Sequence, residues 1–118
     1  MSVMTEVLAE LAKIPGVNGA VLVSRDGFVI EGEAADEGVD LEAVGAVVSA
    51  GIGAFEVMGQ ELNVGSLAQG VIEYANGFIV VTLLGDAAAL AIVAELTAHL
   101  GNIRHQVKKH GNSLLQAL

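Results

Sequence analysis

The sequence has no cysteine and no tryptophan, and it contains one proline, one tyrosine and three phenylalanines. Because there is no thiol, the chain forms neither disulfides nor thiolate metal sites, which is compatible with the cytoplasm, where we expect the protein to be located. The scarce aromatic side chains also leave little to line a pocket for a small molecule. A small-molecule sensor or an enzyme is therefore the least favoured class of function.

Positive charge is scarce as well, because 5 lysine and arginine residues stand against 14 aspartate and glutamate residues, giving a formal net charge of −9. This balance argues against binding to nucleic acid or to an anionic membrane surface, since both need cations that neutralise phosphates. All acidic residues lie at or before Glu95, whereas Arg104, Lys108 and Lys109 stand in a final segment without acid. These cations either complement the dipole of a helix C-terminus or form an electrostatic docking site.

Long uninterrupted hydrophobic runs are missing, although 53% of the residues are hydrophobic and the mean hydropathy is +0.65. The uncharged stretch 43–55 is too short to cross a bilayer, and the apolar run 74–94 is interrupted by the turn signals Asn76-Gly77 and Gly85-Asp86. No basic region precedes an apolar run at the N-terminus, so the sequence predicts neither a membrane span nor a signal peptide. We expect the apolar residues to be buried in a soluble fold and in an oligomer.

The 118 residues fit a single domain, 1–118, of the α/β class. Helical spacing and short apolar runs predict helices over 2–14, 40–62 and from a cap at Thr97 to Leu118, and strands over 20–24, 28–33, 67–75, 78–84 and 88–94. Arg25-Asp26-Gly27 and Asn76-Gly77 are hairpin signals between neighbouring strands. An acidic loop, 34–39, leads to Asp40, which is expected to cap the long helix.

The helix predicted over 40–62 is apolar on two sides. One stripe is expected to lie on the sheet and consists of Leu41, Val44, Val47, Val48, Ile52, Phe55, Met58 and Leu62. The opposite side, where a surface helix carries charges, has Ala43, Ala46, Ser49, Ala50, Gly53, Ala54 and Val57. Because a domain of this size has one sheet, we expect the same helix of a second subunit to cover this side around a two-fold axis. The alternative is that the other two helices of the chain cover it.

No catalytic or cofactor-binding pattern is recognisable in the sequence. His99, His105 and His110 lie in the last helix without metal-ligand spacing. Gly51-Ile52-Gly53 lies inside a helix, whereas a dinucleotide-binding loop needs a strand–helix turn. The acidic loop lacks the ordered spacing of a calcium site. We therefore expect no enzyme activity, no cofactor and no metal.

Five short phrases occur in order along the chain: Ile14-Pro15-Gly16-Val17-Asn18-Gly19-Ala20, Val23-Ser24-Arg25-Asp26-Gly27, Asn76-Gly77-Phe78, Leu84-Gly85-Asp86 and Asn102-Ile103-Arg104. Together they resemble the Roadblock (dynein light-chain type) domain family, in particular its bacterial and archaeal MglB-like members. The resemblance spans nearly the whole chain. It implies a profilin-like αββαβββα sandwich, in which a five-stranded antiparallel sheet has the long helix on one face and the other two helices on the opposite face.

The resemblance also implies a homodimer in which the long helices and the edge strands around 68–74 pair into one continuous sheet. With the two-sided helix, this predicts an interface of Ala43, Ala46, Ser49, Ala50, Gly53, Ala54, Val57, Ala68, Gly70, Ile72 and Tyr74. Relatives bind small Ras-like GTPases, and some stimulate GTP hydrolysis. Contacts to such a partner are expected at Glu56, Gln60 and Glu61, and secondarily at Asp36, Glu37, Arg104 and Lys108.

Two functions follow from this resemblance. The first is a non-enzymatic homodimeric regulator or scaffold that binds a small Ras-like GTPase and holds its switch loops in one arrangement. Modulation of GTP hydrolysis, as by a GTPase-activating protein, belongs to this hypothesis. The second is a structural adaptor in a motor or signalling complex without a GTPase partner.

Overall fold

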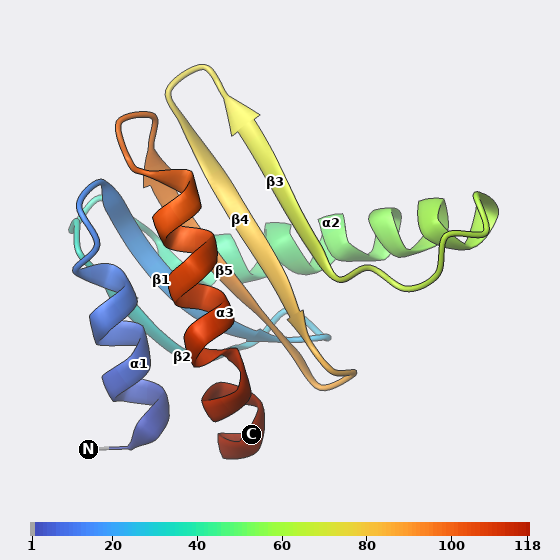
Figure 1. Cartoon of the computed structure of the whole chain (residues 1–118), viewed down its shortest axis with the longest axis horizontal. Helices are drawn as coiled ribbons and strands as arrows, with labels where there is room; N and C mark the ends of the chain where they lie inside the picture. The colour runs from blue at the N-terminus through green and yellow to red at the C-terminus, as the bar shows by residue number, and fades with distance from the viewer. Residues whose placement is uncertain (1) are drawn as a thin grey trace.

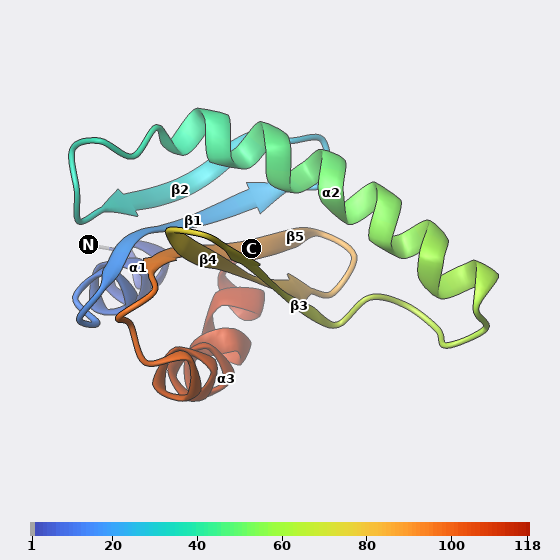
Figure 2. The same cartoon turned by 90° about the horizontal axis from the view of Figure 1, so that it is seen from above.

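The structure, a computed structural model, describes residues 2–118. Its elements are α1 Val3–Ala12, β1 Val17–Ser24, β2 Val29–Ala34, α2 Leu41–Glu61, β3 Gln69–Tyr74, β4 Gly77–Leu84, β5 Ala88–Glu95 and α3 Leu100–Ala117. The five strands form one antiparallel sheet in the order β2-β1-β5-β4-β3. Helix α2 covers one face, and α1 and α3 cover the other (Figures 1 and 2). The predicted sandwich is therefore confirmed.

Apolar side chains fill the space on both sides of the sheet. The larger cluster, between the sheet and helices α1 and α3, includes the fully buried Leu8, Leu22, Leu90, Ile92, Ile103 and Leu114. The smaller cluster, under α2, includes Val21, Val23, Val48, Ile52, Val81, Ala89 and Ala91. Since β5 is covered on both faces, it needs apolar residues at successive positions. This explains why the run 88–94 is a strand, as predicted.

Helix α2 lies on the sheet along only part of its length. It begins over β2 and β1, and its C-terminal part extends beyond the edge of the sheet (Figure 2). Its buried residues are Gly45, Val48 and Ile52. The predicted sheet-facing stripe is therefore wrong in its wider part, because Val47, Phe55, Met58 and Leu62 are exposed by between 39% and 68%. The helix contacts the sheet through a narrow side and leaves it after Ile52.

The hairpin between β3 and β4 differs by one residue from the prediction. Its loop is Ala75-Asn76, because Tyr74 pairs with Gly77 in the β3–β4 register. Gly77 is therefore the first residue of β4 and has no left-handed backbone conformation. Instead, a Cβ atom at Gly77 would lie 2.5 Å from the carbonyl oxygen of Ala94 in β5. The glycine is needed because two strands approach closely, and not for the turn.

The N-terminal cap of α2 was predicted correctly, whereas that of α3 was not. Asp40 caps α2 as expected. Helix α3 begins at Leu100, and its cap is His99, whose Nδ1 accepts a hydrogen bond of 2.9 Å from the backbone N–H of Asn102. The prediction of Thr97 as the cap was wrong, because Thr97 lies in the preceding turn, where its hydroxyl contacts Glu95 at 3.4 Å.

Candidate functional site

The outward side of α2, which we call the outer α2 face, is an exposed surface without charge. It consists of Ala43, Ala46, Ala50, Gly53, Ala54 and Val57, all of them exposed. Helices α1 and α3 lie on the opposite side of the sheet (Figure 2). The alternative that the chain's own helices cover this side is therefore wrong. Ser49, predicted on the same side, is half-buried, and its hydroxyl donates a hydrogen bond of 2.8 Å to the carbonyl oxygen of Arg25.

Two glycines of α2 show where this helix meets its own chain and where it does not. A Cβ atom at Gly45 would lie 3.2 Å from the carbonyl oxygen of Gly27 and 3.2 Å from Cγ2 of Val29. At Gly53, an added Cβ atom would find nothing within 4 Å. Glycine inside a helix costs about 1 kcal/mol relative to alanine. Packing within the chain explains this cost at Gly45 but gives no reason for it at Gly53.

An apolar groove of about 200 Å³ separates α2 from β3 and β4. It is lined by Val47, Val48, Gly51, Ile52, Phe55, Leu67, Gly70, Ile72, Tyr74, Ile79 and Val81. Three of the residues predicted for the dimer interface, Gly70, Ile72 and Tyr74, thus lie beside the helix that supplies the others. A Cβ atom at Gly70 would also find nothing within 4 Å. The fourth, Ala68, is exposed just before β3.

Strand β3 is an edge strand, because β4 is its only neighbour in the sheet. Its outer backbone groups are unpaired within residues 2–118, and Val71 and Tyr74 are exposed by 39% and 57%. An exposed apolar edge can pair with another strand, and native proteins cover or protect such edges. The outer α2 face, the apolar groove and the β3 edge adjoin one another, and we refer to them together as the α2–β3 surface.

By length and hydropathy, α2 meets the criteria for a membrane-spanning helix, and 17% of its most apolar window is buried in the chain. A single helix of this kind is weak ground for a span, since helices that are covered by protein meet the same criteria. Its exposed side carries small residues, which favour close helix–helix contact. The α2–β3 surface therefore has the properties of a surface that packs against protein.

The residues predicted to contact a partner through α2 and the loop before it lie at both ends of this helix. Gln60 and Glu61 are exposed at the end that extends beyond the sheet. Glu56 is half-buried, and its Oε1 lies 3.1 Å from Nη2 of Arg25 in an ion pair. Asp36 and Glu37 are exposed in the loop before α2, at the other end of a helix of 21 residues that is roughly 30 Å long at 1.5 Å per residue. The structure therefore does not bring these residues into one site.

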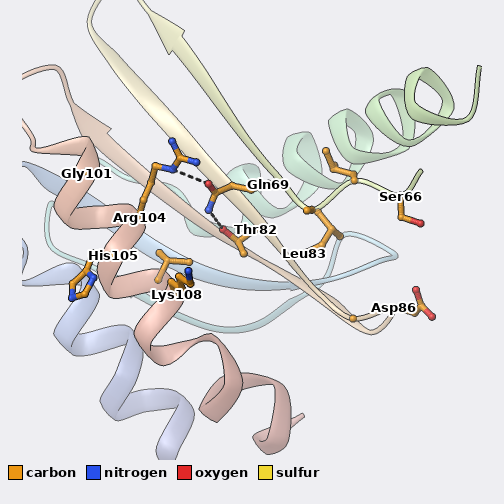
Figure 3. A pocket seen from close by; sticks show the side chains of 13 residues that line it. Ser66, Gln69, Thr82, Leu83, Asp86, Gly101, Arg104, His105 and Lys108 are labelled. Carbon is orange, nitrogen blue, oxygen red and sulfur yellow. Dashed lines mark hydrogen bonds between the residues drawn. The ribbon is translucent and has the colours of Figure 1, made fainter. Parts of the chain in front are cut away.

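Arg104 and Lys108 lie on α3, on the other side of the sheet from α2, and line a groove of about 750 Å³ between α3, β3 and β4 (Figure 3). Nε of Arg104 donates a hydrogen bond of 2.9 Å to Oε1 of Gln69, and Nε2 of Gln69 donates one of 3.1 Å to Oγ1 of Thr82. The last turn of α3 has no basic residue. Interaction with the helix C-terminus therefore does not explain these cations, and the docking alternative remains.

The three histidines lie at the start of α3 or within it. His99 caps the helix, His105 is exposed, and Nε2 of His110 lies 3.3 Å from a carboxylate oxygen of Glu10 on α1, without the alignment of a hydrogen bond. Among residues 2–118, no group of three histidine, aspartate or glutamate side chains is arranged to hold a metal ion.

Comparisons with known proteins agree with this architecture. The family model of the Roadblock/LC7 domain matches residues 4–94. An uncharacterised protein of Methanocaldococcus jannaschii is 36% identical over 110 residues, which cover 92% of this chain and 93% of that protein. Among solved structures, Myxococcus xanthus MglB has a TM-score of 0.88 at 18% identity and covers 97% of this chain and 86% of its own. An MglB described with a tetrameric arrangement has a TM-score of 0.87 at 24% identity and covers 95% and 85%.

Proposed function

Because the chain belongs to the Roadblock/LC7 domain family, we propose that it is a cytoplasmic homodimer that docks and regulates a small Ras-like GTPase and is not itself an enzyme. The family and the fold support a regulator or adaptor in general terms. The single observation that carries the dimer is the α2–β3 surface, where an uncharged helix face, an apolar groove and an unpaired strand edge adjoin.

Several features of this surface fit a second copy of the chain. A two-fold axis beside β3 joins the two sheets edge to edge and places both α2 helices on one face of the combined sheet. The partner's α2 then covers the apolar groove, and the open positions at Gly53 and Gly70 allow backbones to approach closely. This arrangement buries Tyr74 and Val57, which are each more than half exposed in the single chain.

The paired α2 helices also provide the surface for the GTPase. Their projecting ends carry Gln60 and Glu61, which remain exposed and belong to neither cluster of the core. A partner that binds this surface in one nucleotide state more tightly than in the other shifts its own equilibrium towards that state. Modulation of GTP hydrolysis is the expected consequence for the GTPase.

Light scattering tests the dimer. We expect a particle of twice 12.0 kDa, and we expect Ala50→Glu together with Gly53→Glu to give a folded monomer, because buried unpaired carboxylates oppose the helix contact. Ala117→Glu is the control, since it places the same side chain on an exposed helical alanine of α3. A wild-type protein that stays monomeric at high concentration would contradict the proposal.

Titration calorimetry tests the GTPase. The purified Ras-like GTPases of the source organism are titrated in their GDP form and bound to a non-hydrolysable GTP analogue, and hydrolysis is measured with and without this protein. We expect state-dependent binding that is weakened by Gln60→Lys with Glu61→Lys, without a change in the mass of the dimer. Glu95→Lys on the far side of the molecule is the control. A dimer that binds none of them in either state would leave the adaptor function in its place.

A further inference from the structure

Arg104 is held at the free edge of the sheet. Its side chain crosses from α3 over β4, and its Nε donates to Gln69, the first residue of β3, at 2.9 Å (Figure 3). Gln69 is fixed in turn by its 3.1 Å hydrogen bond to Thr82. Among residues 2–118, Arg104 forms no ion pair. The guanidinium is therefore positioned in advance, with the donors of its two Nη atoms left for an acceptor.

The two faces of β3 differ in their side chains. Successive side chains of a strand point to opposite faces. Gln69, Val71 and Glu73 lie on the α3 face, as the contacts of Gln69 and the pairing of Glu73 with the core residue Phe78 show, while Gly70, Ile72 and Tyr74 line the apolar groove on the α2 face. Glu73 is exposed and forms no ion pair among the described residues.

These faces limit how two β3 strands can pair. Directly opposed residues of an antiparallel pair point to the same face of the sheet. If both α2 helices lie on one face of the combined sheet, each residue of β3 also points to the same face as its own copy, so a residue can oppose only residues an even number of positions away. An antiparallel two-fold pair must therefore be centred on a residue, and the centres that oppose more than one residue of β3 are Gly70, Val71, Ile72 and Glu73. A centre at Gly70 or Glu73 opposes only three residues of the strand, whereas a centre at Val71 or Ile72 opposes five.

Charge distinguishes the two remaining registers. Centred on Ile72, the pair opposes Glu73 to Val71 of the partner subunit, which leaves the carboxylate beside an apolar side chain and Arg104 without an acceptor. Centred on Val71, it opposes Glu73 to Gln69 of the partner subunit, the residue that holds the guanidinium of the partner's Arg104. Opposite charges across a strand pair stabilise it.

We infer that, in the dimer, Arg104 of each subunit forms an ion pair with Glu73 of the partner subunit, and that this pair sets the β3–β3 register with Val71 at its centre. The inference rests on the proposed dimer and adds the polar contact that fixes its geometry. By symmetry the contact occurs twice, so each change in sequence acts at two places. Because Arg104 is exposed in the single chain, its main effect is on register and specificity, and its effect on affinity is modest.

Charge exchange tests the ion pair by sedimentation equilibrium. We expect Arg104→Glu and Glu73→Arg each to raise the dimer Kd by about tenfold, because the modest effect of one reversed charge occurs at two places in the dimer, and we expect the double variant to recover most of the lost affinity, as a double-mutant cycle requires for interacting side chains. Lys109→Glu is the control, since it makes the same charge change on α3 outside the groove. The inference would be overturned if the single variants raised the dimer Kd no more than Lys109→Glu does, or if the double variant bound no more tightly than the single variants. Either result would leave the proposed dimer in place.

Disulfide cross-linking tests the register independently, because the chain has no cysteine of its own. At a centre of two-fold symmetry, a residue faces its own copy at a distance that a disulfide can bridge. We expect Val71→Cys to cross-link faster than Ile72→Cys under mild oxidation. Faster cross-linking of Ile72→Cys would overturn the inferred register, whereas a wild-type protein that is monomeric would contradict the proposed dimer itself.

Discussion

At the scale of single residues, the glycines differ in what surrounds them, and this determines the effect of adding a methyl group. The left-handed conformation of Gly27, with a φ of +92°, is required by the β1–β2 hairpin. Gly77, in contrast, is required because the carbonyl group of Ala94 lies against it. A sequence motif such as Asn76-Gly77 cannot distinguish these two reasons, since both select the same residue.

Gly77→Ala is expected to lower the free energy of unfolding by about 2 kcal/mol or more, because the added Cβ atom forces β4 and β5 apart at a backbone contact. Urea denaturation at a fixed protein concentration measures the change. Gly65→Ala is not a suitable control, since Gly65 has a φ of +92°. Gly70→Ala in β3 serves instead, with both changes made in the monomeric background of Ala50→Glu and Gly53→Glu, so that the subunit interface does not contribute. If Gly77→Ala lowered the free energy of unfolding by less than Gly70→Ala does, the close contact between Gly77 and Ala94 would be contradicted.

Gly45→Ala and Gly53→Ala are expected to have opposite effects on the helix that they share. At Gly45 the new atom meets the β1–β2 hairpin at 3.2 Å and lowers stability by about 1 kcal/mol despite the better helix propensity. At Gly53 it meets open space in the single chain, so the isolated subunit gains up to about 1 kcal/mol. Unfolding of both variants is measured in an Ala50→Glu background, at a protein concentration at which light scattering finds this background monomeric. Equal effects would contradict the assigned packing.

At the scale of elements, hydropathy patterns located all three helices and five strands, because each element buries at least one side that recurs with its own period. The predicted first and last residues of these elements were less accurate where a tertiary contact determines the boundary. The start of α3 is one example, since Thr97 and His99 are both able to accept a hydrogen bond from a helix N-terminus. The selection of His99 depends on the path of the preceding turn, which the local sequence does not specify.

His99→Ala is expected to destabilise α3 by about 1 kcal/mol, because the backbone N–H of Asn102 loses its acceptor. For a domain of this size, that corresponds to a decrease in Tm of about 4 °C. Circular dichroism melting curves measure it. Thr97→Ala should lower Tm by much less, and the reverse order would restore the original prediction of the cap.

The candidate site was predictable in part for similar reasons. The small residues on one side of α2 are visible in the sequence, since the absence of charge on a surface helix already indicates a covered face. The connection between Arg104, Gln69 and Thr82 is not visible, because these residues are far apart in the chain and meet only after α3 packs on the sheet. The width of the buried stripe on α2 was overestimated because periodicity does not show how far a helix extends beyond its sheet.

At the scale of the whole molecule, stability and association are expected to be coupled. The α2–β3 surface exposes apolar side chains that a second copy would cover in the proposed dimer, so association would contribute to the free energy of unfolding and would depend on concentration. Tm should therefore rise when the protein concentration is raised about tenfold. Scanning calorimetry at two concentrations measures the shift. For the monomeric variant with Ala50→Glu and Gly53→Glu, Tm should not change with concentration.

The part of α2 that extends beyond the sheet affects how fast the monomer is degraded in a cell. A newly synthesised subunit that has not yet dimerised has few contacts that hold residues 57–61 in helical form, and segments with few buried contacts open most readily. Such a stretch is a substrate for cellular proteases, whereas contact with the second α2 in the proposed dimer would hold it in helical form even though Gln60 and Glu61 stay exposed. Degradation would then remove monomers selectively. The steady-state amount of the protein would depend on how much of it is dimeric more closely than on the rate of translation.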